Sequence, residues 1–441
     1  MKRFIPKKLL NLYHLLWAYG GALWYGFPSK KLFVIAVTGT KGKSTVAELI
    51  RAILAEAGYT VALASTIRFC IGQESTPNLF KMTMPGRAYL QQFLRKAVTA
   101  GCTHAVVEMT SEGAVQFRHK GIALDALVFT NLQPEHLESH GGIEHYAAVK
   151  LSLAKHLKKS SKRPRYIVAN IDDAYGAKFL EAAVEVCVPF SLSDAEPYTA
   201  DDRSVRFVYK REELFTAPLP GLFNLKNILA AMALCDGIGI PHEKIKRALE
   251  HIEPIAGRAE YVERGQNFSV VVDYAHTPDS LRALYETFAS PQRTVLGEPR
   301  LKDGPLRQII CVLGNTGGGR DTWKRPLMGA IAEEHCSQVI LTNEDPYDEN
   351  PRAILDAMRS GMKREPTVIL DRREAIAHAL ALAQTLRQAQ GDQNIAVLIT
   401  GKGTDPYIMG PRGSKQPWSD KVVAEEELDK LLHKKVPSAV V

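Results

Sequence analysis

The stretch FVIAVTGTKGKSTVAELI, residues 33–50, decides the fold of this chain. It begins as an apolar strand, continues into a glycine-bearing turn and ends in an amphipathic helix. In such a unit the glycines let backbone N–H groups turn toward phosphate oxygens, and the helix N-terminus adds a favourable dipole. The stretch therefore predicts a phosphate-binding loop at the start of an α/β domain.

The residues expected around the phosphates run from the end of the strand into the helix: Gly39, Thr40, Lys41, Gly42, Lys43, Ser44 and Thr45. Lys43 is expected at the β- and γ-phosphates. Ser44 would present its hydroxyl to Mg²⁺, which prefers oxygen ligands. The usual Walker pattern places its first glycine where this chain has Val37, so the loop is a departure from that pattern.

Strand-like runs alternate with helical stretches along most of the chain, which predicts an α/β architecture with mainly parallel sheets. A first series of strands is expected at residues 32–37, 105–108, 126–130 and 166–170, with a helix at 45–57. A second series is expected at residues 269–273, 308–313, 338–342, 367–370 and 395–400. A helical segment at 224–251 separates the two series, and we expect a domain boundary near Pro254.

The composition argues against several kinds of site and partner. The six cysteines of the 441 residues are scattered, so neither a zinc site nor a disulfide framework is indicated. The net charge of +8 is spread along the chain without interleaved aromatic residues. A small anionic substrate explains this excess better than nucleic acid does, and we expect no nucleic-acid partner.

The amino-terminal segment LLNLYHLLWAYGGALWYGF, residues 9–27, is free of Asp, Glu, Lys and Arg and has lysine pairs on both sides. Its asparagine, histidine and paired glycines weaken the case for a full membrane span. No small-residue cleavage site follows, so a secretory signal is not expected. Three alternatives remain open: a helix packed on the first domain, an interfacial membrane helix, which the Trp and Tyr residues favour, and a transmembrane anchor.

The loop TGTKGKST resembles the shortened P-loop of the Mur ligase and folylpolyglutamate synthetase superfamily, and further motifs occur in the family's order. Residues 107–113, VEMTSEG, resemble its E-x-S-S-H-G segment. The resemblance implies that Glu108 is a Mg²⁺ ligand and that Ser111 lies near the reacting carboxylate. Glu112 stands where relatives have a histidine, and Arg118 matches an arginine that faces the acceptor in relatives.

Residues 130–141, TNLQPEHLESHG, resemble T-N-L-x-x-D-H-L-D-x-H-G, with Glu135 in place of the usual Asp. The resemblance implies that His136 is a second magnesium ligand. Lys150 falls where many relatives have an N-carbamylated lysine, an anion that could hold magnesium and orient the γ-phosphate. From the residues alone Lys150 is a solvated helix residue, and both interpretations stay open.

Residues 221–231, GLFNLKNILAA, resemble a family helix in which Asn227 contacts the nucleotide, although Asn224 could serve only as a helix cap. Residues 273–278, DYAHTP, closely resemble a motif of the family's carboxy-terminal domain and include His276. The loop at residues 314–326 resembles G-x-G-G-x-R-D-x-x-K-R-P. Its basic residues suit anionic partners, and they are Arg320, Lys324 and Arg325.

The motifs together are most similar to the branch that adds the third residue of the peptidoglycan stem peptide. Relatives that use diaminopimelate carry D-N-P-R, where this chain has Tyr347 in place of the arginine. Residues 401–405, GKGTD, stand where relatives have G-K-G-H-E, and Asp405 keeps an acid that could hold the incoming ammonium. The residues expected at the amino acid are Asp345, Pro346, Tyr347, Gly401 and Asp405.

The resemblance implies an ATP- and Mg²⁺-dependent ligase that activates a muramoyl-peptide carboxylate as an acyl-phosphate and joins a free amino acid to it. A folylpolyglutamate synthetase-like ligase, a stem-peptide amidating subunit and a noncatalytic nucleotide-binding scaffold remain as alternatives. We expect an apolar segment at 1–31, an ATP-binding domain at 32–254 and a second α/β domain at 255–441, with a Rossmann-like fold. We expect a cytoplasmic monomer, with contact to the inner face of the membrane through residues 9–27.

Only about 32 residues precede the first strand, whereas the resembling enzymes have a whole domain there that grips UDP, and a domain usually needs at least 50 residues. We therefore expect the acceptor to be held differently, for example as a lipid-linked muropeptide near the membrane.

Overall fold

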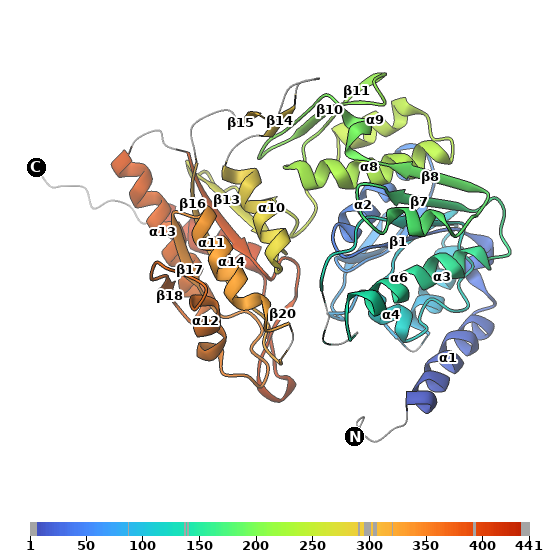
Figure 1. The fold of residues 1–441 in the computed structure, drawn as a ribbon, viewed down its shortest axis with the longest axis horizontal. Helices are drawn as coiled ribbons and strands as arrows, with labels where there is room; N and C mark the ends of the chain where they lie inside the picture. The colour runs from blue at the N-terminus through green and yellow to red at the C-terminus, as the bar shows by residue number, and fades with distance from the viewer. Residues whose placement is uncertain are drawn as a thin grey trace, which may run out of the picture. The chain divides into compact units, whose positions relative to one another are not determined.

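The computed structural model describes residues 7–86, 88–135, 138, 141–289, 292–294, 301–302, 307–319, 321–390 and 394–433. It divides into two compact units (Figure 1). The N-terminal unit contains Met1–Tyr198, Arg206–Pro218 and Phe223–Ile252. The C-terminal unit contains Thr199–Val205, Leu219–Leu222 and Glu253–Val441.

The N-terminal unit is built on an eight-stranded sheet with the strand order β4-β3-β2-β5-β1-β6-β7-β8. Its strands are β1 (Phe33–Thr38), β2 (Val61–Ala64), β3 (Arg68–Ile71), β4 (Glu74–Pro77), β5 (His104–Glu108), β6 (Ala126–Phe129), β7 (Tyr166–Asn170) and β8 (Val186–Phe190). The strands from β2 to β8 in this order run parallel, and only β3 and β4 at one edge are antiparallel. The predicted α/β fold with a mainly parallel sheet is confirmed.

Helices cover this sheet, and β1 leads through the glycine turn directly into α2 (Figure 1). The helices of the unit are α1 (Lys7–Trp24), α2 (Lys43–Glu56), α3 (Tyr89–Thr99), α4 (Ser111–Val115), α6 (Ile143–Lys158), α7 (Gly176–Leu180), α8 (Leu222–Gly237) and α9 (His242–Glu250). The helical segment expected at 224–251 is two helices, because Gly239 and Pro241 interrupt it. The strands β9 (Tyr198–Ala200), β10 (Val205–Tyr209) and β11 (Glu213–Ala217) are neighbours in a separate sheet.

The C-terminal unit has a six-stranded sheet with the order β12-β13-β19-β16-β17-β18. Its strands are β12 (Glu260–Tyr261), β13 (Ser269–Asp273), β16 (Gln308–Leu313), β17 (Gln338–Leu341), β18 (Thr367–Val368) and β19 (Ile395–Thr400). All pairs are parallel except the edge pair β12–β13. The second predicted α/β domain therefore also has a mainly parallel sheet.

The helices of this unit are α10 (Pro278–Ala289), α11 (Lys324–His335), α12 (Pro351–Arg359), α13 (Arg372–Gln390) and α14 (Asp420–His433). Two hairpins complete it: β14 (Gln292–Thr294) with β15 (Leu301–Lys302), and β20 (Tyr407–Met409) with β21 (Lys415–Pro417). The apolar strands and helices α13 and α14 share one core. This packing leaves the loops at the carboxyl ends of the strands to carry polar groups.

Helix α1 projects along the surface of the N-terminal unit (Figure 1). Its residues Ala18 and Ala22 are buried, whereas most of its large side chains are exposed. Across the described part of the chain, no helix has the length and apolar content needed to cross a membrane. The spanning interpretation of residues 9–27 therefore finds no support in this helix.

Candidate active site

The glycine turn lies at the carboxyl end of β1, between the ends of β5 and β6. Gly39 has a φ of 144° and Gly42 a φ of 80°, a backbone conformation that residues with a Cβ rarely adopt. A Cβ at Gly39 would lie 2.0 Å from Oγ1 of Thr130, and one at Gly42 would lie 2.1 Å from Oδ1 of Asn227. Both glycines are therefore required by the local conformation and by close neighbours.

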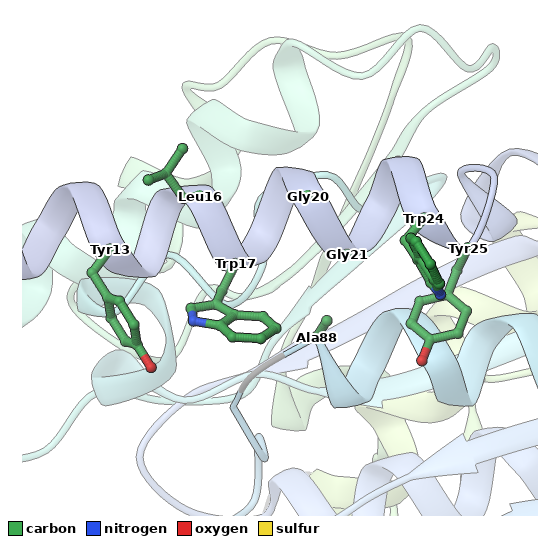
Figure 2. A pocket seen from close by; sticks show the side chains of 8 residues that line it. All are labelled: Tyr13, Leu16, Trp17, Gly20, Gly21, Trp24, Tyr25 and Ala88. Carbon is green, nitrogen blue, oxygen red and sulfur yellow. The ribbon is translucent and has the colours of Figure 1, made fainter.

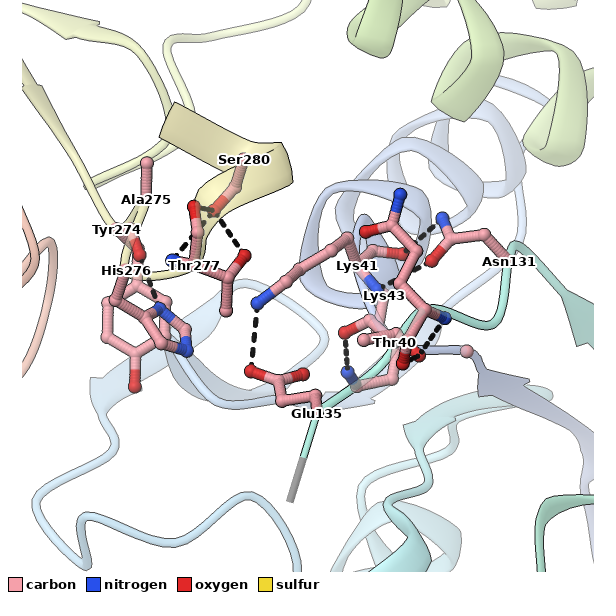
Figure 3. Close-up of polar contacts among 12 residues, drawn as sticks. Thr40, Lys41, Lys43, Asn131, Glu135, Tyr274, Ala275, His276, Thr277 and Ser280 are labelled. Atoms are coloured by element: carbon pink, nitrogen blue, oxygen red, sulfur yellow. Dashed lines mark hydrogen bonds and ion pairs between the residues drawn. The ribbon is translucent and has the colours of Figure 1, made fainter. Parts of the chain in front are cut away.

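The residues that follow β6 hold the turn in shape (Figure 3). Asn131 accepts hydrogen bonds from the backbone N–H of Thr40 (2.8 Å, at its carbonyl) and of Lys41 (2.9 Å, at its side chain). The hydroxyl of Thr130 donates to the carbonyl of Lys41 at 2.7 Å. Because these contacts occupy two loop N–H groups, the donors that an anion would meet are those of the first turn of α2, where Ser44 and Thr45 lie.

Two lysines of the turn make internal contacts (Figure 3). The ammonium of Lys43 donates to the carbonyl of Thr40 at 2.8 Å, so the side chain folds back over the turn. Lys41 forms an ion pair with Glu135 at 2.9 Å, in which the carboxylate is nearly buried. Glu135, which differs from the aspartate of the resembling motif, thus reaches the turn.

Lys150 lies on α6 with only 1% of its surface exposed. Its ammonium donates to the carbonyl of Gly39 at 2.7 Å and lies 4.8 Å from the centre of the Tyr146 ring. Burial lowers the pKa of Lys150 well below its ordinary value, and the nearby cation Lys43 lowers it further, whereas Glu135 opposes the shift. The interpretation of Lys150 as a solvated helix residue is wrong.

Glu108 ends β5 beside the turn, and its side chain is buried. Its Oε2 accepts hydrogen bonds from the hydroxyl of Ser44 at 3.0 Å, from the hydroxyl of Thr66 at 2.9 Å and from the N–H of Thr66 at 2.8 Å. Two oxygen groups predicted to bind Mg²⁺ are therefore adjacent. His136, the other predicted ligand on this side, lies outside the described residues.

Helix α8 reaches the turn through Asn227, whose Oδ1 faces Gly42 and whose amide donates to Oδ1 of Asn224 at 3.2 Å. Asn224 is buried, and α8 begins at Leu222, so the interpretation of Asn224 as a helix cap is wrong. The nucleotide contact of Asn227 stays a prediction.

Ser111 is buried at the start of α4, where the hydroxyl of Thr110 caps the helix by accepting from the N–H of Gly113 at 3.1 Å. Arg118 is partly buried and donates to the carbonyl of Met84 and to Oε1 of Gln116. Burial lowers its pKa, and the charge of the nearby Glu112 opposes this shift. Their predicted roles toward the acceptor are not tested by these contacts.

In the C-terminal unit, Lys402 is completely buried among oxygen acceptors. Its ammonium donates to Asp345 at 2.9 Å, to the carbonyl of Tyr407 at 2.6 Å and, more weakly, to Asp405 at 3.4 Å. Asp345 also accepts from the N–H of Met409 at 2.8 Å. The predicted substrate residues Asp345 and Asp405 thus share one buried lysine. Lys402 lies in the motif at residues 401–405 but was not among the predicted site residues.

Glu344 lies next to this cluster and is buried. Its Oε1 accepts from the hydroxyl of Thr316 at 2.7 Å, and a Cβ at Gly401 would lie 2.3 Å from its Oε2. Within the described residues this Oε2 has no hydrogen-bond partner. Burial raises the pKa of Glu344, and the charge of Asp345 raises it further.

The loop after β17 also packs closely on the loop after β16. The N–H of Gly317 donates to the carbonyl of Asp345 at 2.8 Å, and a Cβ at Gly317 would lie 2.3 Å from the carbonyl oxygen of Pro346. Tyr347 has a φ of 52°, and its N–H donates to the carbonyl of Met409 at 3.0 Å. The predicted substrate residues therefore belong to one tightly packed pair of loops.

Three basic residues of this unit, Arg320, Lys324 and Arg325, were predicted to contact anionic partners. The guanidinium of Arg325 is buried and makes two hydrogen bonds to the carboxylate of Glu349, at 2.6 and 2.9 Å. Its Nε also donates to Asn315 at 3.3 Å. Lys324 is buried at the start of α11, and Arg320 lies outside the described residues. A phosphate contact of Arg325 would thus compete with a bidentate ion pair already made.

His276 follows β13, and its Nδ1 is 2.7 Å from the carbonyl oxygen of Tyr274 (Figure 3). Asp273, at the end of β13, accepts from the N–H groups of Ala259 and Ala275, both at 2.6 Å. The aspartate of the D-Y-A-H-T-P motif therefore shapes the backbone that presents His276.

Sequence reasoning missed three side chains that support these loops: the half-buried Thr66 and the buried Lys402 and Arg372. The guanidinium of Arg372 donates to Asp420 at 2.8 and 2.7 Å and to the carbonyl of Thr400 at 2.7 Å. A lysine inside a glycine-rich loop was a usable signal for Lys402. Neither Thr66 nor Arg372 stands in a motif that could have identified it.

Comparison with known proteins agrees with this geometry. The Mur ligase middle domain matches residues 37–235, and the Mur ligase glutamate ligase domain matches residues 257–403. A UDP-N-acetylmuramoyl-L-alanyl-D-glutamate--2,6-diaminopimelate ligase of Syntrophomonas wolfei is 36% identical over 419 residues, which are 92% of this chain and 80% of that protein. The protein of the same name from Caldanaerobacter subterraneus is 34% identical, with the same coverage.

Solved structures show the same fold. The structure of a UDP-N-acetylmuramoyl-L-alanyl-D-glutamate--2,6-diaminopimelate ligase has a TM-score of 0.60 at 27% identity and covers 95% of this chain and 83% of that chain. A folylpolyglutamate synthase of Mycobacterium tuberculosis has a TM-score of 0.69 at 15% identity and covers 96% of both chains, a likeness of fold alone. Because two family domains match most of the chain and relatives at 36% and 34% identity align over 80% of their length, the chain belongs to the Mur ligase family of ATP-dependent, ADP-forming ligases.

Proposed function

We propose that this chain joins a free amino acid to a carboxylate of a muramoyl-peptide in peptidoglycan synthesis, with ATP as the energy source. The observation that carries the proposal is the arrangement around the glycine turn, where Ser44, Glu108 and Lys150 meet beside the start of α2. The relatives named above act, by their names, on a UDP-linked muramoyl dipeptide and 2,6-diaminopimelate.

The oxygen groups present fit Mg²⁺. Ser44 and Glu108 offer a hydroxyl and a carboxylate 3.0 Å apart, and hard divalent cations prefer such ligands. When bound there, Mg²⁺ would neutralise charge on the phosphate oxygens. We propose His136 as a further ligand from the sequence motif.

We propose that the chain's own groups act chiefly by positioning and by charge. The N–H groups at the start of α2 would bind the phosphates, and Lys43 would leave the carbonyl of Thr40 to contact the β- and γ-phosphates. The substrate carboxylate attacks the γ-phosphorus, ADP leaves, and the amine then displaces phosphate from the acyl-phosphate. Ser111 and Arg118 are proposed at the acceptor, Asn227 and His276 at the nucleotide, and Arg320, Lys324 and Arg325 at anionic groups.

Lys150 is proposed to be carbamylated. Its amine is buried, and its lowered pKa favours the neutral form, which is the form that can attack carbon dioxide. An N–C bond then forms, one proton is released, and the product is a carbamate anion. In ¹³C NMR, the protein supplied with labelled bicarbonate should show a carbamate signal that Lys150→Arg lacks, and identical spectra would contradict the proposal.

We propose that the amino acid binds at the loops that carry Asp345, Pro346, Tyr347, Gly401 and Asp405. Asp405 is the acid proposed for the incoming ammonium, because it stands where relatives have the acid of G-K-G-H-E. With Tyr347 in the place of an arginine, a second carboxylate on the amino acid lacks that clamp.

We further propose a cytoplasmic monomer with domains at residues 32–254 and 255–441. Residues 1–31 would make peripheral contact with the inner face of the membrane. The exposed apolar side chains of α1 support this contact.

The test measures amino-acid-dependent phosphate release with a panel of amino acids and with UDP-linked, lipid-linked and folate acceptors. We expect turnover with a muramoyl acceptor and its loss in Lys43→Ala. The control Lys178→Ala removes an exposed lysine of α7 and should retain turnover. Undiminished turnover in Lys43→Ala would defeat the assignment, and turnover with folate alone would assign the chain to the alternative ligase class.

A further inference from the structure

Helix α1 carries an unusual share of the exposed apolar surface. Nineteen large apolar side chains are exposed among the described residues, and eight of them lie on this helix: Leu9, Leu12, Tyr13, Leu16, Trp17, Tyr19, Leu23 and Trp24. Single exposed apolar residues are normal on a protein surface, but a contiguous patch marks an interaction site. We call these eight residues the α1 stripe.

The stripe occupies one side of the helix. At about 100° per residue its members fall within roughly 160° of the helix circumference, and no charged residue interrupts them. Figure 2 shows Tyr13, Trp17 and Trp24 projecting from successive parts of α1 along a groove of about 490 Å³. Trp24 is the most exposed of the set, at 84%.

The opposite side of α1 fixes this orientation. It consists of the small residues Ala18, Gly21 and Ala22, and a Cβ at Gly21 would lie 2.3 Å from the Cβ of Ala88. Arg95 donates to the carbonyl oxygens of the two residues that follow the helix, at 2.7 and 3.1 Å. The close packing and this anchor hold the small residues against the unit and leave the stripe exposed, with Tyr13, Trp17 and Trp24 bordering the groove that Ala88 also lines.

Charge indicates what covers the stripe. Residues 1–32 contain six basic residues and no acidic one: Lys2, Arg3, Lys7, Lys8, Lys30 and Lys31. They flank the stripe on both sides, and the first acidic residue of the chain is Glu48. Two copies of α1 paired in either direction would bring basic ends together, whereas anionic lipid headgroups attract both ends.

We propose that the α1 stripe docks the protein on a membrane that contains anionic phospholipid. Helix α1 lies along the bilayer surface, because it does not have the length and apolar content to span it. The leucines enter the boundary of the acyl chains, the Trp and Tyr rings lie at the headgroup level, and the positive charge of the residues that flank α1 in the sequence attracts the anionic surface. An interfacial helix ordinarily needs a polar face of its own, but here the N-terminal unit covers that side.

This inference deepens the peripheral contact included in the proposed function. Its test measures lipid binding alone, so a negative result leaves the ligase assignment intact, and loss of ligase activity leaves the lipid result intact.

The full chain is floated with vesicles of phosphatidylcholine alone and with vesicles that contain roughly one third phosphatidylglycerol. We expect binding to the anionic vesicles, weaker binding to the neutral ones and a decrease with added salt. The triple variant Leu16→Ser/Leu23→Ser/Trp24→Ser should lower the partition coefficient by about tenfold or more. All three side chains are exposed, so the fold should be retained, which circular dichroism checks.

The matched control Leu214→Ser/Leu327→Ser/Val422→Ser removes three exposed apolar side chains elsewhere and should bind as the wild type does. Quenching by brominated lipid should fall in Trp17→Phe/Trp24→Phe, because the other two tryptophans of the chain lie outside α1. Equal vesicle binding by both triple variants would overturn the proposal. Absence of vesicle binding, together with self-association that the α1 variant abolishes, would overturn it in favour of a second copy of the chain.

Discussion

Removal of the buried ammonium of Lys402 should strongly destabilise the C-terminal unit. Lys402→Met keeps an unbranched side chain of similar length but leaves Asp345, whose side chain is 3% exposed, without its cation. Breaking a buried ion pair from one side costs about 3–5 kcal/mol, because the remaining charge is uncompensated. For a domain of this size each kcal/mol lowers the melting temperature by about 2–4 °C, so the decrease should be about 6–20 °C.

The assay is urea unfolding followed by tryptophan fluorescence, since Trp323 and Trp418 lie in the C-terminal unit. The control is Lys430→Met, which removes an exposed lysine that pairs with Glu427 at 2.8 Å in the same unit. Lys430 is exposed and Glu427 keeps its ion pair with Arg373, so this variant should lose about 0–1 kcal/mol and unfold close to the wild type.

A double variant isolates the interaction between the two charges. Asp345→Asn in the Lys402→Met background removes the orphaned charge. The double variant should therefore lose at least about 1 kcal/mol less free energy of unfolding than the sum of the losses of the two single variants. The reasoning is refuted if Lys402→Met costs no more than Lys430→Met, or if the two substitutions are additive.

Two further predictions concern acid stability and the glycine turn. Burial, together with the charges of His156 and Lys120, lowers the pKa of His119 to about 2. The folded protein therefore keeps this ring neutral, while the unfolded chain protonates it below about pH 6.5. The free energy of unfolding should therefore fall with acid, and the slope from this residue should approach about 1.4 kcal/mol per pH unit below about pH 5.5. Urea titrations between about pH 7 and pH 5 should show a shallower fall in His119→Gln, and parallel slopes would contradict the assignment. Gly42→Ala should weaken ATP binding by about tenfold or more in calorimetry, because its Cβ would clash with the neighbouring amide at an unfavourable φ. Gly58→Ala has a similar φ of 93° but open space around it, so it should leave ATP affinity unchanged, and equal losses in both variants would exclude the clash.

The part of the site that could be predicted consists of contiguous motifs. The glycine turn was predictable because a strand, positive-φ glycines and a helix start occur within one short stretch. The burial of Lys150 was not, because one lysine on a helix has no local pattern that reveals what packs over it. The break between α8 and α9 was missed although Gly239 and Pro241 signal it, because buried apolar residues occur on both sides of it.

The pairing of Arg325 with Glu349 shows the same limit in the C-terminal unit. A basic loop predicts an anionic partner, but the residues alone do not distinguish a substrate from a carboxylate of the chain itself. Sequence reasoning chose the substrate, and the structure supplies a carboxylate that already occupies both arms of the guanidinium.

The amino-acid sequence by itself determined the parallel α/β class, the conformation of the glycine turn and the order of the motifs, because each depends on residues close together in the chain. Only the tertiary structure decided which distant groups meet. Ser44 contacts Glu108 across 64 residues, and Lys402 contacts Asp345 across 57 residues. These contacts depend on the order and register of the strands. Hydrophobic periodicity shows which face of a helix or strand is buried, but it does not show which other element packs against that face.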